Sequence, residues 1–333
     1  MNRLVGSAAG LLTIFLVAVT IYAQKDGEIA VPKSYRPPVM NRASDLQSVL
    51  DAAMNDALTQ FAAKGFKPED VAATVVDIRD VASWKIADRR GEVRIYPASV
   101  SKMFYMAALE RQLEDKKVKL TPELERGERD MIVDSSNEAT QYVLDVITNT
   151  SSGAEKPQKE FDAWQFKRNR VNRWFSSMGY TNININQKTF CEDAYGIERQ
   201  SRNFPTEAAN RNMLTTNATA RLMAEIVSGN IATPERTAKM MNLMKRDPWG
   251  KSVDADDQNN GFTGKYFIDR NIRDIKLWSK AGWTSKTRHD VAYVETADGL
   301  KFVLAVFTEN HSTERNFIPT VAGKVIELIR QKK

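Results

Sequence analysis

The chain has 333 residues, a net charge of +6 and 42% hydrophobic residues, a globular composition that excludes collagen, low-complexity disorder and a polytopic membrane protein. A single cysteine, Cys191, rules out an intrachain disulfide, and two histidines, His289 and His311, are too few for an ordinary zinc site. Positive and negative charges are mixed along the chain, so we expect no nucleic-acid partner. Because Cys and His are so few, we also expect no metal, and we expect no cofactor.

The first 23 residues have the pattern of a signal peptide. Arg3 supplies a positive charge, Leu11–Tyr22 is apolar, and Ala23 ends an acceptable cleavage site, which would leave Gln24 first. The alternative is an uncleaved anchor, because residues 4–23 are about long enough to span a bilayer. Both interpretations predict export to the periplasm or the outside, with a membrane contact only if the segment is kept.

Residues 24–43 contain three prolines and several charges, which is typical of a linker. Apolar and turn-forming residues then alternate with periods that distinguish helices from strands. In chain order they predict a helix over 46–61, strands over 71–78 and 83–87, helices over 99–113, 137–147, 161–178, 218–227 and 234–245, strands over 275–280, 291–296 and 301–307, and a closing helix over 318–329.

Two strands at the beginning and three at the end enclose a helical block, which favours an α+β fold with one antiparallel sheet built from both ends of the chain. We expect one domain over 44–333. Its sheet half would come from 44–98 and 265–333, and its helical half from 99–264. Residues 180–213 are irregular and rich in Asn, and a loop of this length in a compact domain is usually functional.

Ser99 and Lys102 form an S-x-x-K at the predicted start of a helix. Residues three apart share a helix face, so the lysine amine would lie beside the serine hydroxyl. A serine needs a base to become a nucleophile, and a lysine can be that base. The motif alone occurs by chance in chains of this size, but Pro97 before it and an apolar helix after it strengthen the interpretation.

Two further segments carry polar groups that could serve the same site. Ser135-Ser136-Asn137 begins the next helix, and Lys280-Ala281-Gly282 ends a strand. Each has an ordinary structural alternative. The first could be a helix N-cap cluster, and the second a bulge glycine beside a surface lysine.

Together, in this order, the three segments resemble the penicillin-recognising serine hydrolases, in particular class A β-lactamases with their S-x-x-K, S-x-N and K-T/S-G elements. The resemblance extends from Leu46 to Ile329 through the segments YPASVSK, SSNEAT, TTNATARLMAEIVSG, VAYVE and KFVLAVFTEN. It implies a five-stranded antiparallel sheet flanked by helices, plus an all-helical half, with the active site between them.

The resemblance also implies a role for each matched residue. Ser99 would be the nucleophile, Lys102 its base or proton relay, and Ser135 the group that passes a proton to the leaving group. The other positions would bind substrate: Asn137 its amide, Lys280 with Gly282 its carboxylate side, Arg288 or His289 the carboxylate, and the N–H groups of Ser99 and Trp283 its carbonyl oxygen.

The sequence departs from the class A pattern in two important places. Ala281 replaces the usual hydroxyl residue of the K-T/S-G triplet, and the E-x-x-L-N segment that supplies the deacylating glutamate is not found. Glu192, Glu198 and Glu207 lie in the long loop, and we choose Glu192 because it follows the strand-like residues 183–185 at about the right distance from Gly179. His289 and Asp290 are neighbours in a strand, so they face opposite sides and cannot form a Ser-His-Asp relay.

The leading hypothesis is an exported serine hydrolase that opens a β-lactam amide through a Ser99 acyl-enzyme. One alternative is a D,D-peptidase or esterase that acts on a peptidoglycan-like peptide or another non-lactam substrate. The other alternative is a penicillin-binding or sensing domain that deacylates slowly.

Overall fold

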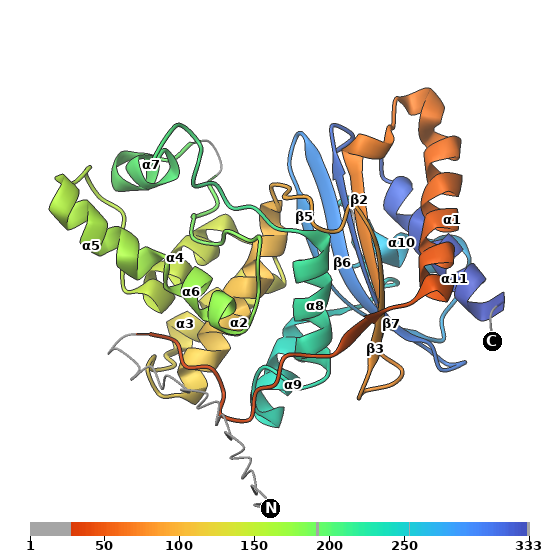
Figure 1. Cartoon of the computed structure of the whole chain (residues 1–333), viewed down its shortest axis with the longest axis horizontal. Helices are drawn as coiled ribbons and strands as arrows, with labels where there is room; N and C mark the ends of the chain where they lie inside the picture. Colours follow the sequence, from red (N-terminus) through yellow and green to blue (C-terminus); the bar gives the residue numbers. More distant parts are fainter. Residues whose placement is uncertain (1–27, 191–192, 253, 332–333) are drawn as a thin grey trace, which may run out of the picture.

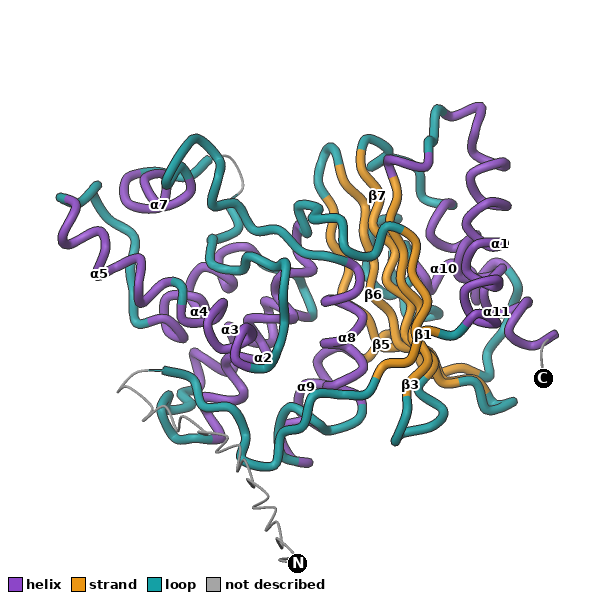
Figure 2. The backbone as a smooth tube through the Cα atoms, viewed as in Figure 1, coloured by secondary structure: helices purple, strands orange, loops and turns teal. Residues whose placement is uncertain are grey.

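A seven-stranded sheet forms the centre of the protein, whose computed structural model describes residues 28–190, 193–252 and 254–331. The strands lie side by side between the helices (Figure 2). Their order is β1-β3-β2-β7-β6-β5-β4, and all neighbours are antiparallel except β1 and β3. The strands are β1 (Met40–Arg42), β2 (Val71–Asp77), β3 (Trp84–Arg89), β4 (Lys245–Arg246), β5 (Ile275–Trp283), β6 (Thr287–Thr296) and β7 (Lys301–Glu309).

The prediction of an α+β fold is confirmed, whereas the prediction of five antiparallel strands is wrong. The five expected strands are all present, and the two additional ones lie at the edges. β1 has three residues within the expected linker, and β4 has two residues directly after a helix. Segments this short carry no detectable period of two, so hydrophobic patterning could not reveal them.

Helices cover both faces of the sheet (Figure 1). They can do so because the strands carry apolar side chains on both faces. Ala73 and Val75 of β2 pack against α1 (Ser44–Phe61) and α11 (Phe317–Gln331), beside the short helix α10 (Thr263–Asp269). Ala72 and Val76 face the other side, where α8 (Thr216–Val227) and the helical half lie. Burial on both faces explains why β2 reads as an uninterrupted apolar run.

The helical half matches its prediction in outline and differs in three segments. It contains α2 (Ser101–Glu114), α3 (Pro122–Ile132), α4 (Asn137–Thr148), α5 (Gln158–Arg168), α6 (Arg170–Ser177), α7 (Gly196–Arg202) and α9 (Pro234–Met244). The single helix expected over 161–178 is two helices that meet at Asn169. Helix α3 was not predicted, because its sequence PELERGERDMI is mostly charged, and α7 lies within the loop expected to be irregular.

Residues 28–39, part of the expected linker, run along the helical half before β1 joins the sheet (Figure 1). Tyr35 anchors this segment with a side chain that is 7% exposed. Its hydroxyl donates to Glu225 Oε1 at 2.9 Å and accepts from Arg221 Nη2 at 2.8 Å, both on α8. The segment therefore links the helical half to the edge of the sheet.

No helix within the described ranges is long and apolar enough to cross a membrane. The expected signal peptide or anchor, residues 1–23, lies outside the described residues.

We expect Tyr35→Phe to lower the free energy of unfolding by about 1–3 kcal/mol, because the fully buried Glu225 carboxylate loses a hydrogen-bond donor. Denaturant unfolding measures the change. Tyr195→Phe, at a side chain that is 70% exposed, is the matched control and should be neutral. Equal stability of the two variants would contradict the role given to Tyr35.

Candidate active site

Ser99 lies in a turn of 3-10 helix (Ala98–Val100) that leads directly into α2. Ala98 has a φ of +47°, a left-handed conformation that is costly for a residue with a side chain and that is often found at functional sites. Ser101 Oγ donates to Ala98 O at 2.9 Å and is fully buried, whereas Ser99 is partly exposed. Of the two serines, Ser99 is therefore the one that a reagent can reach.

His289 of β6 holds the chain just before this turn. Its Nε2 donates to Tyr96 O at 2.9 Å, because its Nδ1 accepts from Thr308 N at 3.1 Å. Burial lowers the pKa of His289 to about 4, so the ring is neutral at pH 7. Asp290, on the opposite side of the strand, accepts from Thr263 N at 3.1 Å, so His289 and Asp290 form no catalytic pair.

Lys102 brings the first and second segments together. Its side chain is fully buried, and its Nζ donates to Ser135 O at 2.5 Å and to Asn137 Oδ1 at 2.9 Å. The same Nζ lies 3.3 Å from Ser135 Oγ. The structure thus gathers Lys102, Ser135 and Asn137 one helical turn after Ser99.

Ser136 is the helix N-cap of its segment, and Ser135 is the residue whose hydroxyl belongs to the site. Ser136 is the N-cap of α4, since its Oγ accepts from Ala139 N at 3.1 Å. Ser135 precedes it with a φ of +56°, so the chain turns and its hydroxyl meets the two lysines. The capping interpretation holds for Ser136 alone.

Lys280 reaches the same hydroxyl from β5. It is fully buried, and its Nζ donates to Ser135 Oγ at 3.0 Å, to Gln258 Oε1 at 2.5 Å and to Ala281 O at 2.9 Å. Burial first, and then the charges of Lys102 and Arg246, hold the pKa of Lys280 well below its usual range. The interpretation of Lys280 as a surface lysine is therefore wrong.

Gly282 lets β5 approach the Ser99 turn. A Cβ at this position would lie 2.6 Å from Pro97 O and 3.1 Å from Ser99 N, closer than side chains normally approach. The next residue, Trp283, can aim its N–H at the same place. Thr284 N donates to Thr287 O at 3.0 Å, so in this antiparallel pair the Trp283 N–H points away from β6, toward the free edge of β5.

Arg288 is not brought together with the other predicted site residues. It alternates to the face of the sheet opposite Lys280, with a side chain that is 1% exposed. Its Nη1 donates to Asp256 Oδ1 at 2.7 Å and its Nη2 to Gly261 O at 2.5 Å. The guanidinium is thus bound to the loop before α10.

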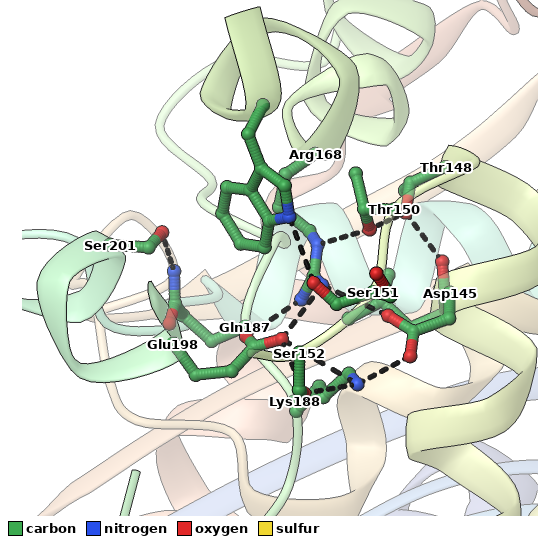
Figure 3. A network of polar contacts seen from close by, with 12 residues as sticks. Asp145, Thr148, Thr150, Ser151, Ser152, Arg168, Gln187, Lys188, Glu198 and Ser201 are labelled. Carbon is green, nitrogen blue, oxygen red and sulfur yellow. Dashed lines mark hydrogen bonds and ion pairs between the residues drawn. The ribbon is translucent and has the colours of Figure 1, made fainter. Parts of the chain in front are cut away.

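The three loop glutamates that could be the deacylating base lie in different surroundings. Glu192 lies outside the described residues, so its role stays a prediction. Glu198 is 1% exposed, and its carboxylate accepts from Arg168 Nη1 and Nη2, both at 2.9 Å (Figure 3). Glu207 is exposed. Glu198 is therefore a structural ion-pair residue, and we do not assign it to deacylation.

A buried polar network fixes the described chain on both sides of residue 192 (Figure 3). On one side, Lys188 Nζ donates to Asp145 Oδ2 of α4 at 2.5 Å. On the other side, the Glu198 pair connects α7 to Arg168 of α5, which also donates to Asp145 Oδ1 at 3.0 Å. Arg168 stands in a run of basic residues in the sequence, yet it is fully buried here.

The same segment is tied directly to the helix that carries Asn137. Gln141 lies one turn after Asn137 on α4, and its Nε2 donates to Thr189 O at 3.0 Å. The loop at Thr189 is therefore held against the helix that carries Asn137.

The chain matches the family model described as the β-lactamase enzyme family over residues 56–329. It belongs to that family. The match confirms the resemblance to the penicillin-recognising serine hydrolases and supports β-lactam hydrolysis by a serine enzyme. No curated protein sequence matches the chain.

Solved structures with the same fold include a β-lactamase from Sphaerobacter thermophilus DSM 20745, with a TM-score of 0.59 and 20% identity over 86% of this chain and 97% of that one. The structure of PBP-A has a TM-score of 0.58 and 15% identity, covering 89% of this chain and 100% of that one. At such identities these structures show the shared β-lactamase fold and nothing finer.

Two residues of this β-lactamase family site were not found from the sequence. Gln258 binds Lys280, and Arg246 donates from its Nη2 to Ser279 O at 2.8 Å, next to Lys280. One comes from a loop and the other from a two-residue strand, so neither stands in a motif. Within the described residues no three His, Cys, Asp or Glu side chains gather in a way that could hold a metal ion.

We expect Gly282→Ala to slow acylation of Ser99 by about 10²-fold, because the added methyl group would displace the nucleophile turn by up to an ångström. The rate of labelling by a fluorescent penicillin measures this. Gly153→Ala is the control, since a Cβ there would meet no atom within 4 Å. Equal labelling rates for both variants would contradict the close approach of β5 to Ser99.

Proposed function

We propose that the protein is an exported serine hydrolase that opens the β-lactam amide through an ester on Ser99. The observation that carries this proposal is the convergence of two buried lysines on one hydroxyl. Lys102 Nζ and Lys280 Nζ lie 3.3 and 3.0 Å from Ser135 Oγ, beside the turn that presents Ser99. This geometry provides a base, a proton donor and a cation for the substrate in one place.

Acylation requires a proton to leave the nucleophile and another to reach the leaving group. Ser99 Oγ attacks the lactam carbonyl carbon while Lys102 accepts the hydroxyl proton. The carbonyl oxygen becomes negative and is stabilised by the N–H groups of Ser99 and Trp283. Ser135 then donates its proton to the lactam nitrogen, the C–N bond breaks, and Ser135 regains a proton from Lys102.

The cations of the site favour a substrate that carries a carboxylate. Lys280 is the buried ammonium closest to the Ser135 hydroxyl oxygen, and Ala281 provides no hydroxyl group beside it. Arg288 lies on the opposite face of the sheet with its guanidinium bound by Asp256, so we do not assign it to the substrate. We therefore assign Lys280 as the positive charge beside the substrate carboxylate, and substrate amide binding to Asn137.

Deacylation needs a base that can activate water, and we assign this role to Glu192. A second candidate function is a penicillin-binding protein or D,D-peptidase whose acyl-enzyme persists. The missing E-x-x-L-N segment is the observation that favours this candidate. A PBP-A mutant solved as an acyl-enzyme complex with penicillin G shares the fold, with a TM-score of 0.58 at 14% identity over 88% of this chain and 99% of that one. The lifetime of the acyl-enzyme separates the two functions.

Ser99→Ala should abolish covalent labelling by a fluorescent penicillin, because no other nucleophile would face the two N–H donors. Ser101→Ala is the matched control and should keep labelling, since Ser101 is buried and bound to Ala98 O. In-gel fluorescence, with circular dichroism to confirm folding, measures both. Labelling that survives in the Ser99 variant would exclude the proposed nucleophile.

Glu192→Gln should lengthen the lifetime of the acyl-enzyme by about 10²-fold or more while leaving its formation unchanged, because only the second half-reaction loses its base. Intact mass spectrometry over time follows the ester. Glu207→Gln, at an exposed position of the same loop, is the control and should match the parent protein. Identical lifetimes in all three proteins would mean that Glu192 is not the base.

A further inference from the structure

Gln258 uses every hydrogen-bonding group of its amide at the edge of the site. Its Nε2 donates to Ile132 O at 3.1 Å and to Val133 O at 3.0 Å. Its Oε1 accepts from Lys280 Nζ at 2.5 Å and from Ala281 N at 3.1 Å. Two acceptors on one side and two donors on the other allow only one orientation of the amide.

These four contacts connect the two halves of the protein. Ile132 and Val133 lie at the end of α3, two to three residues before Ser135. Lys280 and Ala281 belong to β5. The separation of 3.0 Å between Ser135 Oγ and Lys280 Nζ therefore depends on how the end of α3 is held against β5.

Gln258 also completes the coordination of the Lys280 ammonium. A lysine ammonium has three N–H donors, and Lys280 directs them to Ser135 Oγ, Gln258 Oε1 and Ala281 O. All three acceptors are neutral. Without Gln258, the fully buried ammonium would keep only Ser135 Oγ and Ala281 O as acceptors, and one N–H would have no partner. The ammonium could then rotate away from Ser135 to find another acceptor.

We propose that Gln258 is a positioning residue of this site: its amide aims the Lys280 ammonium at the Ser135 hydroxyl and fixes the end of α3 to β5. This inference deepens the proposed function and relies on it only for the activity readout. Gln258 touches neither the nucleophile nor, in this arrangement, the reacting bond. It acts through Lys280 and Ser135, which must share a hydrogen bond for Ser135 to present its own proton to the leaving group.

Two substitutions of similar size should act in opposite directions. Gln258→Glu places a carboxylate beside Lys280 and should raise the pKa of that ammonium, which burial, Lys102 and Arg246 now hold low. Gln258→Met removes an acceptor without adding charge and should lower the pKa further. Asn260→Asp is the matched control, because it adds the same charge in the same loop without replacing a partner of Lys280.

The test is the pH profile of Ser99 labelling by an uncharged fluorophosphonate in the full chain and in these three variants. We expect the alkaline limb, where Lys280 loses its proton, to move up by about one pH unit in Gln258→Glu and down by a similar amount in Gln258→Met. Asn260→Asp should leave the limb unchanged. Shifts in the same direction, or an equal shift in the control, would overturn the inference.

A failure of the proposed function would be recognised separately, as absence of labelling in the unmutated protein. The pH dependence of the free energy of unfolding then decides the role of Gln258. Because the pKa of Lys280 is lowered on folding, stability should rise with pH from that lowered value up to the unfolded value of about 10.4. The rise should begin at higher pH in Gln258→Glu and at lower pH in Gln258→Met, and identical curves would contradict the inference.

Discussion

Burying two lysines around one serine hydroxyl, with an arginine beside one of them, is the constraint on which the site depends. A buried ammonium is costly unless its N–H groups are hydrogen-bonded and charge is offset nearby. Lys102 obtains its acceptors from the turn between α3 and α4, whereas Lys280 obtains them from that turn, from its own strand and from the loop before α10. The acceptors of Lys102 all lie in the helical half, whereas those of Lys280 come from both halves, so Lys280 is satisfied only when the halves are together.

The buried positive charge favours a substrate that carries an anionic group. Arg246 is buried beside Lys280, and burial lowers its pKa to about 10, so it stays charged at pH 7. Asp290 is a buried acid that partly offsets Lys280 and Arg246. An anionic substrate group would offset the remaining positive charge. Two residues of the site, Ala98 and Ser135, also have left-handed backbone conformations, which are costly and are maintained by the packing around them.

The three chemical segments could be found from the sequence because their residues lie in short local patterns at the ends of predictable elements. Ser99, Ser135 and Lys280 each begin or end a helix or strand with clear periodicity. Gln258 and Arg246 could not be found in this way, since their roles depend on which loop crosses the edge of β5. That crossing is set by tertiary packing over more than a hundred residues.

The errors in the fold prediction have related causes. Strands of two and three residues have no period to detect, and charged α3 hides the few apolar residues that it buries. Arg168 illustrates the limit most clearly: it stands in a run of basic residues that is typical of a solvated surface, yet α7 packs over it and buries the guanidinium with Glu198. Local patterns therefore predict elements well, and predict poorly which polar faces become covered.

The most direct test of this account is a crystal structure of the protein after reaction with benzylpenicillin. The account predicts continuous electron density from Ser99 Oγ to the acyl carbonyl carbon, with the carbonyl oxygen between the N–H groups of Ser99 and Trp283 and the carboxylate beside Lys280. Density for a covalent adduct on any other residue, or an acyl oxygen turned away from both N–H groups, would contradict it.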